Sequence, residues 1–334
     1  MKLSSLGEFG LIDSIRKMTA RQSPSVLIGM GDDTAALKIA ASSILLATTD
    51  MLLEDIHFDL SYTDFYSLGW KSAAVNLSDI AAMGGIPRFC LTSLGIPTSV
   101  PVEQIKEFYR GFSAVLRAYR ALLVGGDTCL SREKLIVNVV VLGESEKTHI
   151  VARAGAEPGD RIFVTGTLGD SAAGLDLLRS GSRGRGRDAA EKKLIQKHLR
   201  PMARVEWGML IARSKVAHAM IDISDGLSSD LAHICDDSGV GAKIFIEKLP
   251  YSRSLRTVAD ALGKRISNYA LSGGEDYELL LTAPRRRINK LQSMGIPLTE
   301  IGEITKTRKL LLIDGQGNEK PLFPIGYDHF THRT

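Results

Sequence analysis

The chain has 334 residues, 44% of them hydrophobic and 24% charged, which is ordinary globular composition and a length of about two domains. Cys90, Cys129 and Cys235 are widely separated and form no CxxC pair, so neither a disulfide framework nor a zinc–thiolate site is expected. The formal net charge is +4, but residues 179–200 alone carry a local +6 without any aromatic residue, so nucleic-acid binding is not expected either.

The N-terminal part of the chain predicts strands and helices in alternation. Glu8 and Asp13 interrupt the first stretch before it reaches signal-peptide length, and no run approaches 18 apolar residues, so we expect a cytoplasmic protein without membrane spans. The expected strands are Ser43–Thr49 and Leu135–Leu142, and the expected helices are Asp64–Met83, closed by Gly84-Gly85, and one that begins at Pro101. The second helix has apolar residues at three- and four-residue spacing, which indicates one buried face.

The C-terminal part repeats this mixture after a polar stretch. A strand is expected at Arg161–Thr165, and residues 182–187 predict a surface loop before a solvated helix. Further helices are expected near 201–217, 225–237 and 285–294, and further strands at 243–247, 277–282 and 309–313. We place a domain boundary near residue 148 and expect α+β layering rather than strict βαβ alternation. The echo between Asn76–Asp79 and Asp222–Asp225 is too brief to indicate a repeat.

Several common catalytic motifs are missing from the sequence. There is no P-loop, no HRD or DFG of a protein kinase, no HExxH and no GxSxG. Six short segments instead combine acids with Gly, Ser or Thr: residues 31–33, 48–50, 76–79, 125–128, 222–226 and 273–276. Carboxylates and hydroxyls are ligands suited to Mg²⁺, and paired glycines let backbone N–H groups approach phosphate oxygens. Any one segment could equally be ordinary turn chemistry.

Two of the acids stand out by their surroundings. Asp79 lies in an otherwise apolar helical stretch that includes Ala73, Leu77 and Ile80. A carboxylate there must pair, cap a backbone or bind a metal, because leaving it buried and bare is costly. Asp50 follows an apolar strand directly, at a strand end where sites are often built. Cys129, beside Asp127, is expected to be a small buried hydrophobe rather than a nucleophile.

Together the segments resemble the thiamine-monophosphate kinase family of the aminoimidazole-ribonucleotide-synthetase-like superfamily. The resemblance is carried by GMGDDTAAL (29–37), TTDMLLEDIHF (48–58), NLSDIAAMGG (76–85), VGGDT (124–128), IDISDGLSSDL (221–231), SGGEDYELLLT (272–282) and GYDHF (326–330). The NLSDIAAMG, SGGEDYEL and GYDHF forms indicate this family within the superfamily. The resemblance implies transfer of the γ-phosphoryl group of ATP to thiamine monophosphate, the last step of thiamine diphosphate synthesis.

The resemblance also implies roles for individual residues. Those that match magnesium ligands are Asp33, Thr48, Thr49, Asp50, Asp79, Asp127, Asp222 and Asp225; those that match ATP contacts are Tyr109, Gly126, Asp127, Arg153 and Ser224; those on the thiamine-phosphate side are His57, Glu275 and Tyr327. We predict that Asp50 and Asp79 hold bridging Mg²⁺ ions, that Asp127 and Asp222 complete the cage, and that Arg153 counters phosphate charge. ATP is then a co-substrate and several Mg²⁺ ions are cofactors.

Structural readings of these residues stay open beside the functional ones. His57 could be a packed histidine, Tyr109 a core residue, Glu275 a turn cap and Ser224 only a helix cap. Rival functions are another ATP-using member of the superfamily, such as a purine-pathway or selenophosphate synthetase, and a non-catalytic nucleotide-binding relative. Residues 1–30 lack the reactive Cys expected of a selenophosphate synthetase, and the acidic positions are all filled.

For architecture, the resemblance implies a two-domain fold. Residues 1–148 would form an N-terminal domain for ATP and magnesium binding and for dimerisation. Residues 149–334 would form an α+β domain that completes the cleft, and the N-terminal sheets would pair across the two-fold axis of a homodimer. The expected partners are thus thiamine monophosphate, ATP and a second copy of the chain, with neither nucleic acid nor a membrane among them.

Overall fold

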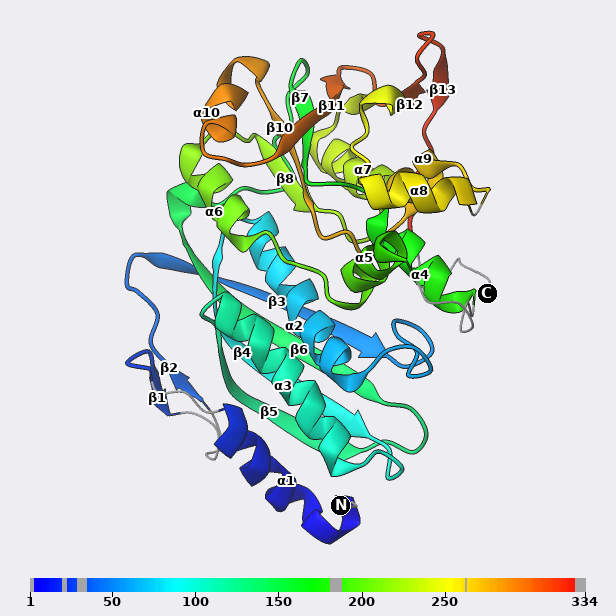
Figure 1. Ribbon diagram of the computed structural model, residues 1–334. Helices are drawn as coiled ribbons and strands as arrows, with labels where there is room; N and C mark the ends of the chain where they lie inside the picture. The colour runs from blue at the N-terminus through cyan, green and yellow to red at the C-terminus, as the bar shows by residue number, and fades with distance from the viewer. Residues whose placement is uncertain (1–2, 20–22, 29–34, 181–187, 262, 328–334) are drawn as a thin grey trace. The chain divides into compact units, whose positions relative to one another are not determined.

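The computed structural model describes residues 3–19, 23–28, 35–180, 188–261 and 263–327. The chain divides into two compact units: unit 1 comprises residues 1–80 and 85–148, and unit 2 comprises residues 81–84 and 149–334 (Figure 1). The domain boundary expected near residue 148 and the roles given to the two domains remain predictions. Asp33, the whole of the surface loop expected at residues 182–187, and residues 328–330 of the C-terminal motif lie outside the described residues.

Unit 1 is built on a four-stranded sheet with helices across one face (Figure 1). In sheet order the strands are β3 (Ser43–Leu53), β6 (Ile136–Glu146), β4 (Ile86–Ile96) and β5 (Leu122–Leu130). β4 and β5 run parallel, and the other two pairs are antiparallel. The helices are α1 (Leu3–Thr19), α2 (Phe65–Ala82) and α3 (Val102–Ala118), with the small pair β1 (Val26–Ile28) and β2 (Ala36–Leu37) and the 3-10 turn η1 (Lys147–His149).

Two glycines bring α2 and α3 together over the sheet. A Cβ atom on Gly69 of α2 would lie 1.9 Å from the carbonyl oxygen of Phe108, and one on Gly111 of α3 would lie 1.9 Å from that of Tyr66. Only glycine permits backbones to approach this closely. The apolar face of α3 is buried as its spacing predicts, with Ile105 and Phe112 no more than 1% exposed. The helix expected at Asp64–Met83 is confirmed with ends one residue shorter.

Unit 2 contains a seven-stranded mixed sheet. In sheet order the strands are β13 (Glu319–Pro321), β12 (Leu310–Ile313), β9 (Gly241–Phe245), β11 (Leu298–Thr305), β7 (Arg161–Thr165), β10 (Leu279–Ala283) and β8 (Ala219–Asp222). The helices are α4 (Asp170–Arg179), α5 (Ala189–Leu199), α6 (Val205–Ser214), α7 (Leu227–Ser238), α8 (Arg253–Ala261), α9 (Ile266–Ser272) and α10 (Ile288–Gln292), with the 3-10 turns η2 (Ile246–Lys248) and η3 (Arg285–Arg287). Every neighbouring pair is antiparallel except β12 and β9, so the expected α+β layering is confirmed.

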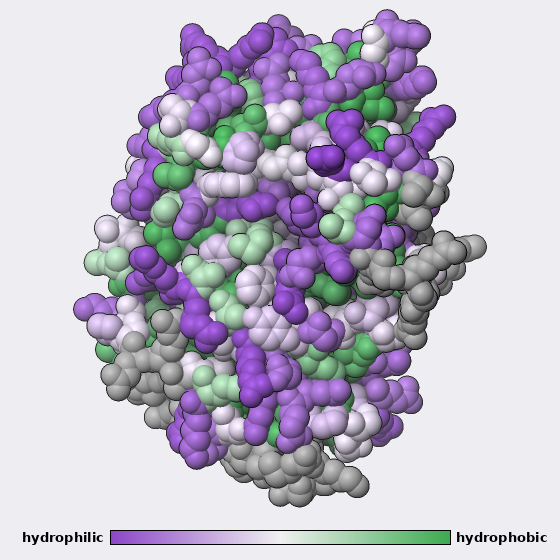
Figure 2. Space-filling view, viewed as in Figure 1, coloured by the Kyte–Doolittle hydropathy of each residue, from purple (hydrophilic) through white to green (hydrophobic). Residues whose placement is uncertain are grey.

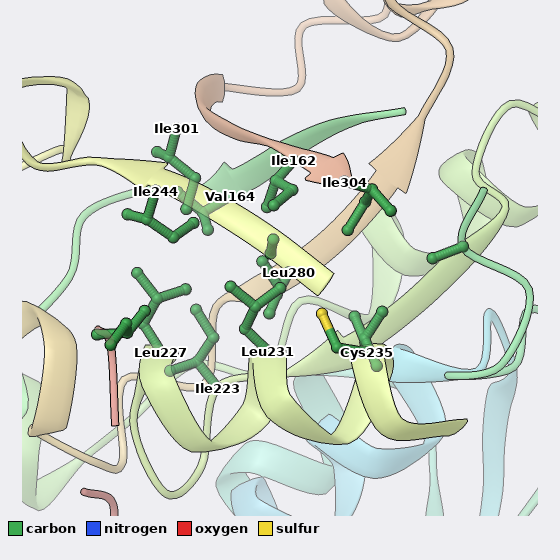
Figure 3. Close-up of a cluster of buried hydrophobic side chains, with 14 of the residues drawn as sticks. Ile162, Val164, Ile223, Leu227, Leu231, Cys235, Ile244, Leu280, Ile301 and Ile304 are labelled. Atoms are coloured by element: carbon green, nitrogen blue, oxygen red, sulfur yellow. The ribbon is translucent and has the colours of Figure 1, made fainter. Parts of the chain in front are cut away.

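The core of unit 2 forms between α7 and the sheet (Figure 3). Leu227, Leu231 and Cys235 recur at four-residue spacing along one face of α7 and point toward Val164 and Leu280 of the central strands (Figure 3). Each fully buried aliphatic side chain of this kind contributes about 1.5–3 kcal/mol to stability. Because α7 follows residues 222–226 directly, this packing also holds that acidic segment in place.

Four local expectations are corrected by the structure. Asp50 lies inside β3 and not at a strand end, because the strand continues through the apolar residues Met51–Leu53. Cys129 is exposed, not buried, because it lies on the edge strand β5. The helix expected at 285–294 is a 3-10 turn followed by the short α10, since three consecutive arginines precede its few apolar residues. The helix expected from 201 begins at Val205.

Polar and apolar residues are interspersed over the face of the molecule shown in Figure 2, where hydrophilic side chains predominate. In the part of the chain that the structure describes, none of the helices has the length and apolar character that crossing a bilayer requires.

Candidate active site

Asp79 is the most constrained acidic residue of unit 1. It lies on α2 facing β3, where its Oδ2 accepts a hydrogen bond from Thr48 Oγ1 at 2.5 Å. Burial raises the pKa of this carboxyl, and the hydrogen bond from Thr48 opposes that rise. A charge held in this position against its desolvation cost is favoured by a nearby cation. Asp79, which the sequence singled out, is thus a carboxylate that accepts one hydrogen bond from a hydroxyl and can bind further ligands.

Thr48 and Asp50 lie on the face of β3 toward which Asp79 of α2 points. They alternate with Thr49 and Met51, so they point to the side on which Leu46 and Leu52 are buried. In the register of the sheet, Asp50 pairs with Val139, Val139 with Thr92, and Thr92 with Gly126. Opposite residues share a face, so this row follows the helix-covered side of the sheet from one edge to the other.

Asp127 lies on the opposite face. It pairs with Ser93, which pairs with Asn138, and Asn138 pairs with the exposed Met51. Three strand spacings of about 4.8 Å separate the edge strands β3 and β5, so Asp127 and Asp50 are about 14 Å apart along the sheet. One Mg²⁺ ion within this sheet cannot be ligated by both. The structure therefore brings Thr48, Asp50 and Asp79 together and separates Asp127 from them.

Gly126 has a clear steric requirement. A Cβ atom on it would lie 2.1 Å from the carbonyl oxygen of Thr92. The neighbouring Asp127 is exposed and lies on the opposite face of the sheet. Thr49 of β3 lies on that face as well, where its Oγ1 is 3.2 Å from Asn138 Oδ1. This glycine lets β5 pair closely with β4 just before Asp127.

His57 and Tyr109 differ in what they offer. The Nδ1 atom of His57 accepts a hydrogen bond from the backbone N–H of Leu53 at 3.0 Å, so the neutral ring carries its proton on Nε2 as a donor. Tyr109 is 2% exposed on α3 and packs edge-on against Phe108, and burial raises its pKa. That environment is the core packing that the sequence left open for Tyr109.

In unit 2, the segments 222–226 and 273–278 are paired through their backbones. Ile223 N–H donates to the carbonyl of Glu278, Tyr277 N–H to that of Ile223 and Glu275 N–H to that of Ser224, at 2.8, 2.9 and 2.7 Å. They extend the antiparallel pairing of β8 with β10 beyond both strands. Two motifs that are about fifty residues apart in sequence therefore form one structural element.

This paired element contains strained backbone. Glu275 and Tyr277 have φ values of +63° and +51°, which side-chain-bearing residues rarely adopt. A Cβ on Gly274 would lie 2.4 Å from the carbonyl oxygen of Ser224. Such conformations persist only where their surroundings fix them, and they cluster at functional sites. The cap of α7 is Gly226, with no side-chain cap hydrogen bond, so Ser224 is not the helix cap.

A third acid joins Asp222 and Asp225 in this region. Asp230 is 1% exposed on α7 and accepts a hydrogen bond from Gly226 N–H at 3.0 Å. Burial, followed by the negative charges of Asp222 and Asp225, raises its pKa to about 8. The negative charges of Asp222 and Asp225 that raise this pKa would also favour a cation bound beside them. Asp230 belongs to the quoted 221–231 motif, so its helical position four residues after Gly226 could have indicated it.

Arg153 and the C-terminal Tyr327 are each held by contacts of their own. Arg153 is about half exposed, and its Nε lies 2.9 Å from Asp237 Oδ2. Tyr327 is 43% exposed, and its N–H donates to the carbonyl of Asp225 at 3.3 Å. The preceding Gly326 N–H donates to Ser229 Oγ at 2.8 Å. The C-terminal segment is thus attached to the first turn of α7, beside Asp225.

The carboxylates fit magnesium rather than a compact zinc-type centre. Among the described residues, no three His, Cys, Asp or Glu side chains form a group that could hold a metal ion. Mg²⁺ usually takes one or two carboxylates and completes its octahedron with water and substrate phosphates. The half-buried Asp79 and the neighbouring carboxyl groups of Asp222, Asp225 and Asp230 supply oxygen donors of that kind.

Comparison with known proteins gives the same family along both units. Residues 31–145 match the N-terminal domain of AIR synthase related proteins, and residues 157–315 match the C-terminal domain of the same family. A solved hydrogenase maturation protein HypE in complex with ATP aligns over 96% of the chain with a TM-score of 0.75 but only 17% identity, which shows a shared fold. The expected two-domain fold is therefore confirmed.

Nearer relatives cover the full length. The thiamine-monophosphate kinases of Aquifex aeolicus and Bacillus subtilis are 42% and 38% identical, over 99% and 97% of this chain and all of each relative. The solved thiamine-monophosphate kinase of Stenotrophomonas maltophilia is 36% identical with a TM-score of 0.82, covering 93% of this chain and 96% of its own. The solved AaThiL complexed with AMPPCP and TMP is 42% identical with a TM-score of 0.79, covering 99% of both chains. With these similarities and both sets of acidic residues in place, the chain belongs to the thiamine-monophosphate kinase family.

Proposed function

We propose that the protein transfers the γ-phosphoryl group of ATP to thiamine monophosphate, giving thiamine diphosphate and ADP. The observation that carries the proposal is the full-length similarity, at 42% identity, to a protein solved with AMPPCP and TMP. In this step an oxygen of the acceptor phosphate forms a bond to the γ-phosphorus. The bond from that phosphorus to the bridging oxygen breaks, and its electron pair leaves with ADP.

The chemistry needs charge neutralisation more than a general base. The acceptor oxygen is already anionic near neutral pH, so no side chain has to remove a proton before attack. Two unit charges of like sign at about 4 Å repel by roughly 1 kcal/mol in water and roughly 4 kcal/mol at an effective dielectric near 20. ATP and the acceptor each carry several charges, so positioning and electrostatics dominate, as in phosphoryl transfer generally.

Magnesium, when bound, would supply that neutralisation of phosphate charge. The side chains that would hold it are Asp33, Thr48, Thr49, Asp50, Asp79, Asp127, Asp222 and Asp225. Because Asp50 and Asp127 point to opposite faces of one sheet, they would serve different ions or different copies of the chain. This separation supports the proposal of several ions rather than one.

The other assigned residues divide between the two substrates. Gly126, Arg153 and Ser224, with Asp127, would contact ATP, and Tyr109 would support that side from the core. His57, Glu275 and Tyr327 would contact thiamine monophosphate. The Nε2–H of His57 is a donor suited to a phosphate oxygen, and the partly exposed ring of Tyr327 is suited to cover a heteroaromatic ring.

The protein would act in the cytoplasm as a homodimer. The face of the unit 1 sheet that carries Asp127 also carries Leu45 and Met51, which are 47% and 54% exposed. A second copy would cover this apolar face and pair the N-terminal domains of residues 1–148, leaving residues 149–334 to complete each cleft.

The test is ADP release measured by a coupled assay with Mg²⁺ and ATP, with and without thiamine monophosphate. Thiamine diphosphate is quantified by chromatography in the same samples. We expect ADP and thiamine diphosphate in equal amounts, and neither in the absence of acceptor. ADP formation that is independent of thiamine monophosphate, or ADP without thiamine diphosphate, would contradict the proposal.

A further inference from the structure

The carboxylate of Glu275 is held by a residue that the proposed reaction does not use. Glu275 has a left-handed backbone, and its Oε2 lies 3.1 Å from Nδ1 of His198 on α5. His198 is 4% exposed. An ion pair or hydrogen bond at such a buried position constrains its partner strongly, because water cannot replace either group without cost.

The chemistry of the contact fixes the donor. An ionised carboxylate only accepts hydrogen bonds, so Nδ1 of His198 must carry the proton that points at Glu275. Ser171 Oγ on α4 lies 3.1 Å from the same Nδ1 atom, so the hydroxyl and the carboxylate both contact this side of the ring. The imidazole is thereby held between a hydroxyl and a carboxylate, in one tautomeric arrangement on the Nδ1 side.

The helix that carries His198 also comes within ion-pair distance of the same paired segment. Lys197 Nζ lies 3.9 Å from Oε1 of Glu278, three residues after Glu275. A Cβ on Gly174 of α4 would lie 2.2 Å from the carbonyl oxygen of Leu194, so α4 and α5 are in backbone contact one turn away from His198. Few alternative positions remain for the imidazole.

We propose that His198 is a positioning residue that orients the carboxylate of Glu275 toward thiamine monophosphate without touching it. The proposal rests on the proposed function, in which Glu275 faces the acceptor. Glu275 has an unfavourable backbone conformation and a flexible side chain of three torsions, so its position depends on an external partner. His198 supplies that partner from a helix outside every motif.

The experiment compares the full-length variants His198→Ala, Glu275→Ala and the double variant in steady-state kinetics. Calorimetric binding of thiamine monophosphate is measured alongside. We expect H198A to raise the KM and the dissociation constant for thiamine monophosphate about tenfold, the scale of one lost hydrogen bond to a charged group, with the KM for ATP unchanged. The double variant should bind thiamine monophosphate no more weakly than E275A.

Two further variants separate positioning from structure. His198→Asn keeps an N–H close to the place of Nδ1, and we expect it to restore binding to within about threefold of the unchanged protein. His218→Ala removes a histidine–carboxylate contact of the same kind, to Asp160 at 2.9 Å, beyond the other end of β8. It should lower the melting temperature and leave both KM values unchanged.

Failures of the inference and of the function are distinguishable. If H198A keeps its acceptor KM while E275A raises it, or if H198N is as impaired as H198A, the positioning role is overturned and the kinase function stands. If E275A itself leaves acceptor binding unchanged, Glu275 does not face the acceptor and the inference is overturned. Absence of acceptor-dependent ADP release from the unchanged protein overturns the function as well.

Discussion

The acidic segment Asn76–Asp79 of unit 1 and the segment Asp222–Asp225 of unit 2 have similar sequences and different structures. The first lies in the C-terminal half of α2, where a regular helix points Asp79 at Thr48. The second follows β8 and pairs with a strained segment that contains Glu275. Small apolar neighbours continue the helix in the first case, whereas in the second the strand ends at Asp222 and Gly226 caps the following helix α7.

The difference teaches that the two units position acids by different means. Unit 1 uses repetitive structure, so each side chain's direction follows from its place on a strand or helix. Unit 2 uses non-repetitive backbone that other elements must fix, namely α5 through His198 and α7 through Ser229. We therefore expect activity to fall when a single charged side chain is removed from unit 1. In unit 2, we expect it to fall when a residue that holds the non-repetitive backbone is changed.

The largest expected effect is that of Asp79→Asn. Removing this charge should lower kcat on the order of 100-fold, the scale of losing one charge-stabilising group. Because burial raises the pKa of Asp79, its charged form costs stability, so the melting temperature should be equal or higher. Calorimetric melting and ADP release, measured on one preparation, test the expected melting temperature and the expected kcat together. A folded variant with near-normal turnover would remove Asp79 from the proposed magnesium site.

Gly274→Ala tests the backbone pairing in unit 2. The added Cβ would meet the Ser224 carbonyl oxygen at 2.4 Å, so the two segments must separate. We expect a loss of about 1–3 kcal/mol in the free energy of unfolding and about tenfold in kcat/KM. Gly317→Ala is the comparison, since nothing lies within 4 Å of its Cβ position; its φ of +83°, which Gly274 does not share, makes it a variant with backbone strain but no steric clash. If both variants keep full activity, the pairing does not position the site.

His57→Ala should have a smaller and more selective effect. We expect the KM for thiamine monophosphate to rise about fivefold, since one donor to a phosphate oxygen is lost, and the KM for ATP to change less. Initial rates over a grid of both substrates measure the two constants together. Equal rises would mean that His57 does not face the acceptor.

Sequence reasoning was most successful where structure is repetitive. The strand at Ser43–Thr49 was predicted from its own residues without long-range information, and the spacing of α3 indicated its buried face. The sequence of β5 shows no clear alternation of apolar and polar residues, because glycines and polar residues occupy the centre of this edge strand. The sequence accordingly gave no sign that Asp50 and Asp127 lie on opposite faces, which follows only from the register of four strands.

The supports of unit 2 could not be predicted for a related reason. Glu275 and His198 are 77 positions apart and meet only through the packing of α4, α5 and the paired segments. No local pattern distinguishes His198 from a histidine at the end of any amphipathic helix. The resemblance to the family indicated Glu275 but not the residue that holds it.

The smallest expected effect is that of Asp237→Ala. Its ion pair with Arg153 joins side chains that are 55% and 43% exposed, and such pairs contribute about 0.2–1 kcal/mol because solvent screens them. We therefore expect stability within about 0.5 kcal/mol of the unchanged protein. Arg153→Ala breaks the same pair and should be equally stable, yet it should raise the KM for ATP several-fold, because a positive charge near phosphate is lost. Denaturant unfolding and ATP-dependent rates for both variants make the comparison. If D237A raises the KM for ATP as much as R153A does, the pair acts as a unit and Arg153 depends on a partner on α7, as Glu275 depends on His198 of α5.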